Sequence, residues 1–331
     1  MQTSSAGMKP YYKCMLAVHL ENGNVEMRQI DPPHRPPGYA LLRLIVAGIC
    51  NTDLELQRGY YGFAGTPGHE FVAEVVETDD RSLVGKRVVG EINLACGGCD
   101  SCRRGLGRHC PTRAVLGIVN HPGAFAEYFT LPESNLHVLP DELANERAVF
   151  AEPLAAACEI LDQVTIPWGE RVAVLGDGKL GLLVALTLDA YGYPVHQFGH
   201  HPDKLAIAAA RGVHTVVTTG NLPTAVFDFV VDATGSAEGL RAAAQLVRPR
   251  GTLVLKSTVH GTVGVDTAPL IVNEITLVGS RCGRFEASLP LLEHRIIPVE
   301  TMIQARFPLS EAPQALAQAA APGTLKVLLE A

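Results

Sequence analysis

A cysteine, a histidine and several acids fall within one short stretch of this chain. The residues Gly48-Ile49-Cys50-Asn51-Thr52-Asp53 are followed, after a tyrosine-rich connection, by Gly68-His69-Glu70. A thiolate, an imidazole and a carboxylate are ligands that Zn²⁺ selects, and a catalytic zinc site also keeps one position open for water or substrate. Cys50 follows an apolar run over residues 40–47, so we expect its sulfur at a strand end, beside a turn. The alternative is a buried cysteine and a hydrogen-bonded histidine without a metal.

Four further cysteines form a compact group with the spacing C-x2-C-x2-C-x7-C: Cys96, Cys99, Cys102 and Cys110. Four thiolates this close in sequence can surround one tetrahedral Zn²⁺, and Gly97-Gly98 lets the chain turn between them. An iron–sulfur cluster is an alternative because Pro111 follows the last cysteine, although the final spacing is longer than in the common bacterial motif; a redox dithiol is another. We expect a closed structural zinc site that stabilises a lobe at residues 94–112.

A glycine-rich turn follows the strand expected at residues 171–175. It reads Gly176-Asp177-Gly178-Lys179-Leu180-Gly181 and leads into a helix that we expect to run to Tyr191. This is G-x-G-x-x-G between a strand and a helix. Its glycines permit the turn, the close approach of a pyrophosphate and tight helix packing, while the helix N-terminus offers amides to the phosphates. The sequence therefore predicts a dinucleotide fold in which five of these residues contact the cofactor: Gly176, Gly178, Lys179, Leu180 and Gly181.

The second strand of this fold, expected at residues 195–198, ends without the acid that binds the ribose of NAD. It ends in Gly199-His200-His201. A missing carboxylate removes repulsion toward a 2′-phosphate, and imidazoles can donate hydrogen bonds to it. We therefore predict NADP(H) in preference to NAD(H). The simpler alternative is that His200 and His201 are solvent-facing loop residues.

The apolar pattern divides the chain into two parts. Short alternating runs broken by prolines, up to Leu131, indicate antiparallel strands and a small distorted barrel, whereas residues 141–162 look helical. The chain then alternates strands and helices, which indicates an α/β fold with a doubly wound parallel sheet. The further strands are expected at residues 214–217, 227–233, 252–256 and 275–279, and the helices at 204–211 and 237–246. The nine residues 218–226 are too few for a crossover helix.

After residue 279 the chain is expected to return to its first part, with a helix at residues 309–320 and a strand at 326–329. The predicted division is a β-rich domain of residues 1–150 and 286–331 and a nucleotide-binding domain of residues 151–285. A chain of 331 residues with 47% hydrophobic and 18% charged residues is consistent with two globular domains.

The net charge of the chain limits the classes of binding partner that we expect. A net charge of −7 argues against nucleic acid and anionic membranes, which favour basic surfaces. The longest apolar stretch, residues 172–188, is interrupted by Asp177 and Lys179 and makes a poor membrane span. The first fifteen residues lack a long apolar run, so we expect a cytoplasmic protein. Clustering of four of the eight cysteines favours metal ligands over disulfides.

Taken together, the Cys50 and His69-Glu70 pair, the four-cysteine lobe and the later dinucleotide fold resemble the zinc-dependent medium-chain alcohol dehydrogenases, in the same order and over essentially the whole chain. The lobe and Glu152-Pro153-Leu154 are most similar to the sorbitol and threonine dehydrogenase branch. The resemblance implies a GroES-like catalytic domain, a Rossmann domain, and two zinc ions per chain. It also implies hydride transfer between NAD(P) and a small-molecule alcohol, polyol or carbonyl, by a homodimer or homotetramer.

The resemblance also implies roles for individual residues. Cys50 and His69 would bind the catalytic zinc, with Glu70 or Glu152 as the carboxylate ligand, and Asp53 would orient His69. The zinc would lower the pKa of the substrate alcohol and stabilise the alkoxide.

The same resemblance assigns the proton relay. Thr52 would pass the substrate proton away, but the family's next relay residue, a histidine, is replaced here by Glu55. Either Glu55 takes that role, or the proton leaves through water or cofactor hydroxyls, and Glu55 is a solvated acid.

Cofactor contacts follow from the same resemblance. Gly176, Gly178 and Gly181 would hold the pyrophosphate, and Lys204 matches a position near the adenosine ribose. Weaker candidates lie at strand ends, where turn residues are common: Thr234, Gly235, Ser257, Arg281 and Lys326. A substrate pocket lined by Tyr60-Tyr61 is a further expectation, with loop aromatics that cover the core as its alternative. Two rival functions are a catalytically silent relative and a non-redox lyase that uses the nicotinamide transiently.

Overall fold

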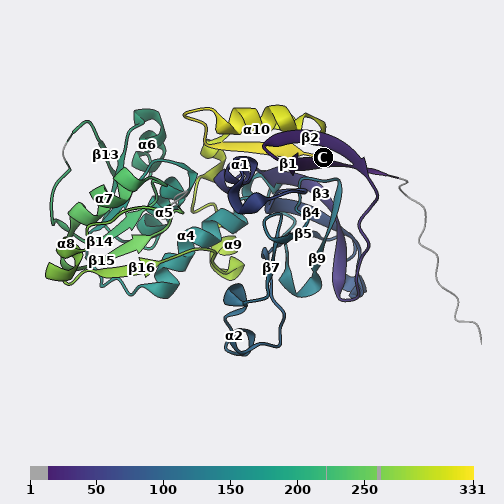
Figure 1. Ribbon diagram of the computed structural model, residues 1–331, viewed down its shortest axis with the longest axis horizontal. Coiled ribbons are helices and arrows are strands. Elements are labelled where there is room, and N and C mark those ends of the chain that lie inside the picture. Colours follow the sequence, from purple (N-terminus) through teal and green to yellow (C-terminus); the bar gives the residue numbers. More distant parts are fainter. Residues whose placement is uncertain (1–13, 221, 259–261) are drawn as a thin grey trace, which may run out of the picture.

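The computed structural model describes residues 14–220, 222–258 and 262–331. They form a β-rich part and a helix-covered parallel sheet that lie side by side (Figure 1). A small lobe with helix α2 (Asp100–Arg103) projects from the β-rich part. No helix of the described residues is long and apolar enough to span a bilayer.

The β-rich part is organised around strand β3 (Tyr39–Gly48). Within the described residues its sheet runs β10-β5-β4-β3-β18-β17, and β9 also pairs with β3. The other strands are β4 (Glu70–Glu77), β5 (Arg87–Gly90), β9 (Tyr128–Pro132), β10 (Leu136–Val138), β17 (Ile303–Pro308) and β18 (Lys326–Glu330). Alternate residues of β3, among them Ala40, Leu42 and Leu44, are buried in the barrel core, as period-2 alternation requires. The pairing of β18 with β3 brings the end of the chain back to this sheet.

Smaller elements complete this part. They are the hairpin β1 (Met15–Glu21) and β2 (Asn24–Ile30), the strands β6 (Asn93–Leu94), β7 (Ala114–Leu116) and β8 (Asn120–His121), and the helices α1 (Asn51–Gln57), α3 (Asn145–Ala148) and α10 (Ala312–Ala320). Strands β6, β7 and β8 form a three-stranded sheet, and the chain of the lobe leaves and re-enters through β6 and β7.

The second part is a sheet in the order β13-β12-β11-β14-β15-β16, with every pair parallel. This is the doubly wound order of dinucleotide folds. Its strands are β11 (Val172–Leu175), β12 (Val195–Gly199), β13 (His214–Val217), β14 (Phe227–Asp232), β15 (Val247–Leu255) and β16 (Thr276–Gly279). Its helices are α4 (Ala151–Gln163), α5 (Lys179–Ala190), α6 (Pro202–Ala209), α7 (Ala237–Leu246), α8 (Ala268–Val272) and α9 (Phe285–Glu293).

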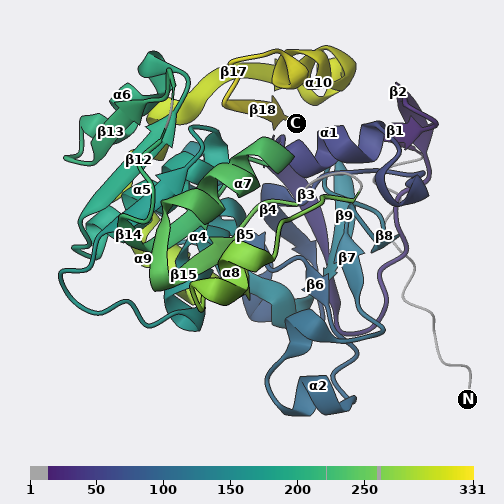
Figure 2. The same ribbon diagram turned by 60° about the vertical axis from the view of Figure 1, so that its left-hand side comes forward.

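Both faces of this sheet are buried. On β11, Val172 and Val174 join the core formed by α4 and α5, whereas Ala173 and Leu175 join the core under α7. Figure 2 shows these helices beside the strands of the sheet. The first of these cores also contains Val72 of the β-rich part, so packed side chains link the two parts. The carboxyl ends of the parallel strands therefore meet the β-rich part at a defined position.

The predicted α/β class and its doubly wound sheet are confirmed, and every predicted strand of that sheet is present. Four of the described helices were not predicted. Helices α1, α2 and α8 have only seven, four and five residues, and α9 contains Pro290, which usually interrupts a helix. The helical stretch expected at residues 141–162 is two helices separated at Val149 and Phe150. Strand β15 begins five residues earlier than expected, and no described residue between 218 and 226 is helical.

Candidate metal and cofactor site

Cys50 lies at the junction between β3 and α1. Strand β3 ends at Gly48, the buried Ile49 follows, and Cys50 precedes the first helical residue. The Asp53 carboxylate accepts a hydrogen bond from the backbone N–H of Cys50 at 2.8 Å. It thereby satisfies an amide at the helix start. Cys50 is at a strand end, as predicted, but a helix follows it in place of a turn.

His69 and Glu70 reach the same point from the neighbouring strand. Glu70 is the first residue of β4 and pairs with Gly48 of β3. The ligand atoms of Cys50, His69 and Glu70 all lie within 4.8 Å of one another. A Cβ atom on Gly48 would lie 2.4 Å from Glu70 Oε2, so glycine leaves the space that this carboxylate occupies. The local sequence thus builds a three-ligand group from two adjacent strand ends.

Asp53 ties the two ligand segments together. Its side chain is fully buried, and its Oδ1 accepts from the N–H of Gly68 at 3.3 Å. The same oxygen lies 3.3 Å from Nδ1 of His69, without the alignment of a good hydrogen bond. Burial opposes protonation of His69, but the Asp53 carboxylate and the Cys50 sulfur outweigh it, so the pKa of His69 is raised well above 6.5. The site therefore favours positive charge, and its donor set fits Zn²⁺.

The Glu70 carboxylate has a partner from the end of the chain. Lys326, in β18, donates a hydrogen bond to Glu70 Oε2, and each side chain is 1% exposed. Lys326 Nζ also lies 5.3 Å from the centre of the Phe150 ring. Lys326 is also a predicted cofactor phosphate or ribose contact. The pairing of β18 with the end of β3 buries this lysine beside Glu70, and its contact with the cofactor stays a prediction.

Glu152, in the first turn of α4, lies close to the same site. Its carboxylate is outside the group that Cys50, His69 and Glu70 form. Burial raises the pKa of Glu152, and the charges of His69 and Glu70 act on it in opposite directions. Glu70 is therefore the acid in the ligand group of this structure, with Glu152 beside it.

The four lobe cysteines converge. Their sulfurs all lie within 4.8 Å of one another, with distances of 3.4 Å from Cys99 to Cys102 and 3.9 Å from Cys99 to Cys110. Four thiolates at ~2.3 Å from a tetrahedral zinc would be separated by roughly 3.8 Å. A hydrogen bond from the Cys96 amide is the main cause that lowers the pKa of Cys110 to about 6. The spacing of the four sulfurs fits a closed Zn²⁺ site.

Thr52 and Glu55 lie on α1, next to Cys50. The Thr52 hydroxyl is 3.7 Å from the Cys50 sulfur. Glu55, one turn further on, pairs with Arg58 at 2.6 Å and is 25% exposed. The structure therefore places Thr52 at the ligand group, while Glu55 is engaged on the helix surface.

The glycine-rich turn has the close contacts that its sequence predicts. A Cβ atom on Gly176 would lie 2.6 Å from the Ala233 carbonyl, and one on Gly181 would lie 2.3 Å from the Gly176 carbonyl. Gly178 precedes α5 and would meet nothing, which leaves the helix N-terminus open. Lys179 reaches across to the β-rich part, where its Nζ lies 3.4 Å from the carbonyl of Ile49.

The end of β12 does carry a carboxylate, from an unexpected source. Asp177, the residue between the first two glycines, accepts hydrogen bonds from the backbone N–H groups of His200 and His201, both at 2.7 Å. Its Oδ2 also lies 3.0 Å from Nδ1 of His201. Strand β12 itself ends without an acid, as the sequence shows, and the adjacent turn supplies one at that point. The sequence signal was present, since Asp177 stands inside the glycine motif.

The remaining residues predicted to contact the cofactor have different surroundings in the structure. Thr234 donates to Asp232 Oδ1 at 2.7 Å, and Gly235 has a φ of 69°, so both serve the turn after β14. Lys204 on α6 is buried, and Ser257 follows β15. The Arg281 guanidinium donates to Asn93 Oδ1 at 2.9 Å and so bridges the two parts of the molecule.

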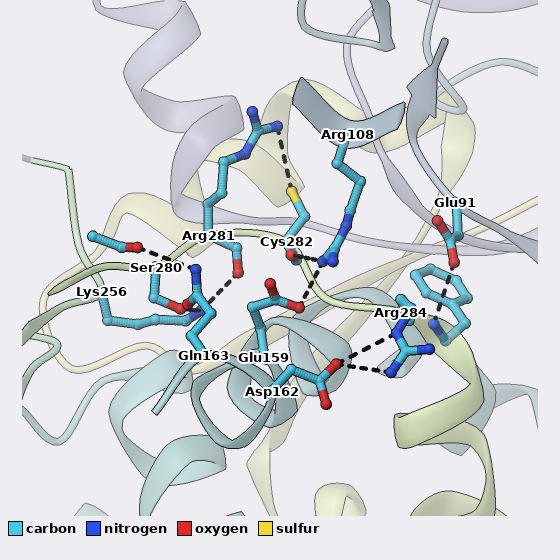
Figure 3. Close-up of polar contacts among 12 residues, drawn as sticks. Glu91, Arg108, Glu159, Asp162, Gln163, Lys256, Ser280, Arg281, Cys282 and Arg284 are labelled. Carbon is cyan, nitrogen blue, oxygen red and sulfur yellow. Dashed lines mark hydrogen bonds and ion pairs between the residues drawn. The ribbon is translucent and has the colours of Figure 1, made fainter. Parts of the chain in front are cut away.

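Residues 279–285 form a strap between β16 and α9 that both parts hold (Figure 3). Buried Lys256 donates to Ser280 Oγ at 2.9 Å and to the Arg281 carbonyl at 2.6 Å. Arg108 of the cysteine lobe donates to the Cys282 carbonyl and pairs with Glu159 of α4 at 2.7 Å. The lobe is thus connected directly to the strap at the edge of the parallel sheet. Sequence patterns gave no sign of these contacts.

The tyrosine pair lies at the surface. Tyr60 and Tyr61 are in contact through their hydroxyls at 3.2 Å, and Tyr61 is 67% exposed. Tyr61 lines a pocket of ≈ 760 Å³ together with Thr66, Arg113 and His121. Cys50, His69 and Glu70 are not among its lining residues, so this pocket is separate from the ligand group in the described chain.

Comparison with known proteins agrees with this geometry. The model of the alcohol dehydrogenase GroES-like domain matches residues 36–141, and that of the zinc-binding dehydrogenases matches residues 180–294. The chain is 32% identical to D-altritol 5-dehydrogenase of Agrobacterium fabrum over 93% of this chain and 97% of that protein. It is 27% identical to sorbitol dehydrogenase of Halalkalibacterium halodurans over 94% and 98%.

Solved structures show the same fold. A zinc-binding dehydrogenase from Sinorhizobium meliloti 1021, bound to NADP, superposes with a TM-score of 0.88 at 29% identity and covers 97% of this chain and 100% of its own. Alcohol dehydrogenase TADH from Thermus sp. ATN1 gives 0.86 at 30% identity, covering 96% and 99%. The chain belongs to the zinc-binding, medium-chain family of alcohol dehydrogenases, as the sequence resemblance indicated.

Proposed function

We propose that this protein is a zinc-dependent oxidoreductase that transfers a hydride between NAD(P) and an alcohol or polyol, or the corresponding carbonyl. One observation carries the proposal: the glycine turn and the metal ligands face each other, with Lys179 Nζ 3.4 Å from the Ile49 carbonyl, next to Cys50. A dinucleotide on that turn would therefore approach the Cys50, His69 and Glu70 group.

Residues of this chain would orient the metal ligands and accept the substrate proton. Zinc, when bound, supplies Lewis-acid polarisation of the substrate oxygen and lowers the pKa of an alcohol. Asp53 holds the Cys50 amide and faces His69 Nδ1, so the other imidazole nitrogen is directed to the metal. The Thr52 hydroxyl, beside Cys50, is placed to take the substrate proton. Glu55, one turn away, is our candidate for the next proton acceptor.

The substrate class proposed is polyols. The relatives named D-altritol 5-dehydrogenase, erythritol/L-threitol dehydrogenase and sorbitol dehydrogenase support it. Two zinc ions per chain are proposed, one at Cys50, His69 and Glu70 and one at the four cysteines. Glu152 is the alternative carboxylate for the first. As for the cofactor, the NADP-bound relative supports the predicted NADP(H), whereas the position of Asp177 favours NAD(H).

A homodimer or homotetramer is proposed for the assembly. β16 is an edge strand of the parallel sheet, and apolar side chains near it are exposed: Ile271 at 72%, Val272 at 79% and Leu277 at 49%. Such an edge can pair with a second copy of the chain. The proposed domain division remains residues 1–150 with 286–331, and 151–285.

Metal analysis combined with a substrate panel tests the proposed activity. We expect two zinc ions per chain and turnover of polyols with NAD⁺ or NADP⁺ that is lost in Cys50→Ser. A protein with one zinc, located in the lobe, and no turnover would contradict the proposal.

A further inference from the structure

The end of β12 is where a dinucleotide fold distinguishes a ribose 2′-hydroxyl from a 2′-phosphate. In the NAD form of this fold an acid at the end of the second strand accepts a hydrogen bond from the ribose. Here that position is Gly199, and a Cβ atom on it would lie 2.5 Å from Asp177 Oδ2. The glycine is therefore needed because the Asp177 carboxylate already fills the space next to the strand end.

Hydrogen bonds hold Asp177 at the end of β12. Asp177 is 7% exposed, and its Oδ2 is surrounded by two backbone N–H groups and the His201 imidazole. Within the described part of the chain, the other carboxylate oxygen, Oδ1, has one hydrogen-bonding contact, to the same imidazole at 3.2 Å. It thus retains acceptor capacity for a hydroxyl donor.

The backbone amides and the Nδ1 atoms of His200 and His201, which a 2′-phosphate could use as donors, are already engaged. The amides of His200 and His201 point at Asp177, and Nδ1 of His200 lies 2.8 Å from the Thr218 hydroxyl. A phosphate at this strand end would lie against a fixed carboxylate of like charge, and like charges at short range repel strongly in a partly buried site.

We propose that Asp177, supplied by the glycine turn, takes the place of the missing strand-end acid, accepts the adenosine ribose 2′-hydroxyl and discriminates against a 2′-phosphate. This specificity role rests on the proposed nicotinamide-dependent function. It makes NAD(H) the preferred cofactor and departs from the preference predicted from sequence.

Binding measurements on the purified holoenzyme test this role without turnover. Calorimetric titrations with NADH, NADPH, ADP and 2′,5′-ADP would give dissociation constants for the wild type and for Asp177→Asn, which keeps an oxygen acceptor for the two amides. The matched control is Asp203→Asn, an exposed acid in the first turn of α6. It removes the same charge from the same region without the contact to the strand end.

We expect the wild type to bind NADH more tightly than NADPH, and Asp177→Asn to shift the ratio of the two dissociation constants toward NADPH by about tenfold or more. The ADP and 2′,5′-ADP pair should shift in parallel, and Asp203→Asn should leave both ratios near the wild-type values. A wild type that prefers NADPH, or an Asp177→Asn variant with an unchanged ratio, overturns the role of Asp177 while dinucleotide binding stands. Failure of all four nucleotides to bind overturns the proposed function as well.

Discussion

Lys326 and Glu70 form a buried ion pair that joins the last strand of the chain to the residue after His69. The two residues are separated by 256 positions in sequence, and each side chain is 1% exposed. The return of the chain to its first sheet therefore places a cation directly behind the metal ligands. A carboxylate that is buried this deeply needs a cation, either a lysine, a metal ion or both.

Removal of this lysine should be strongly destabilising. In the zinc-free protein we expect Lys326→Met to lower the free energy of unfolding by about 3–5 kcal/mol, because Glu70 would keep an uncompensated buried charge. In the Glu70→Gln/Lys326→Met double variant the loss should be smaller than the sum of the two single losses. Urea unfolding measures the free energy of unfolding of the single and double variants. The exposed Arg306–Glu330 pair on neighbouring strands is the control, and Arg306→Met should lower stability by less than about 1 kcal/mol. Equal losses in the two variants would argue against the pair.

The two proposed zinc sites should lose metal independently. Cys102→Ser removes a ligand from the lobe and Cys50→Ser removes one from the other group, so each variant should retain one zinc per chain by elemental analysis. Cys158→Ser, at a buried cysteine outside both groups, should retain two. Iron in place of zinc, or full zinc content in Cys102→Ser, would contradict the assignment of the lobe.

The proton path should depend on the Thr52 hydroxyl. We expect Thr52→Val to lower kcat by on the order of 10²-fold, and Thr52→Ser, which keeps the hydroxyl, to recover most of the rate. If Glu55 accepts the proton next, Glu55→Gln should alter the pH–rate profile. An unchanged profile would assign the exit of the proton to water or cofactor hydroxyls.

The cysteine lobe should stabilise the strap through Arg108. We expect Arg108→Ala to increase hydrogen exchange in residues 279–285, because the Cys282 carbonyl and Glu159 both lose their partner. Zinc content should not change. Arg104→Ala is the control, since Arg104 lies in the same lobe and pairs with the exposed Asp100. Faster exchange in both variants would point to general loosening of the lobe.

Lys256 should make stability depend on alkaline pH. Burial lowers the pKa of Lys256 from 10.5 to about 8 in the folded protein. Between these values the unfolded chain binds more protons, so the free energy of unfolding rises with pH, by up to about 3 kcal/mol. Urea unfolding at pH 7.5 and pH 10.5 should show this rise in the wild type and a smaller one in Lys256→Met. The exposed Lys86→Met should behave as the wild type, and a full rise in Lys256→Met would exclude Lys256 as its source.

The sequence by itself determined the elements and motifs that depend on near neighbours. The alternation of strand-like and helix-like segments located the strands of the parallel sheet, and the G-x-G-x-x-G motif located its first turn. The cysteine spacing defined the lobe, because all four sulfurs lie within one short loop. Helices α1 and α9 were not predicted, and the reasons are also local: α1 is very short, and α9 contains Pro290.

Only the tertiary structure decided which distant groups share a site. It brought Lys326 to Glu70, and it placed Glu70 in the ligand group with Glu152 beside it. It also brought Asp177 to the end of β12, where the linear sequence shows only glycine and histidines. These outcomes depend on strand pairing and helix packing between remote segments, and the spacing of residues along the chain does not encode which of several buried charges will meet.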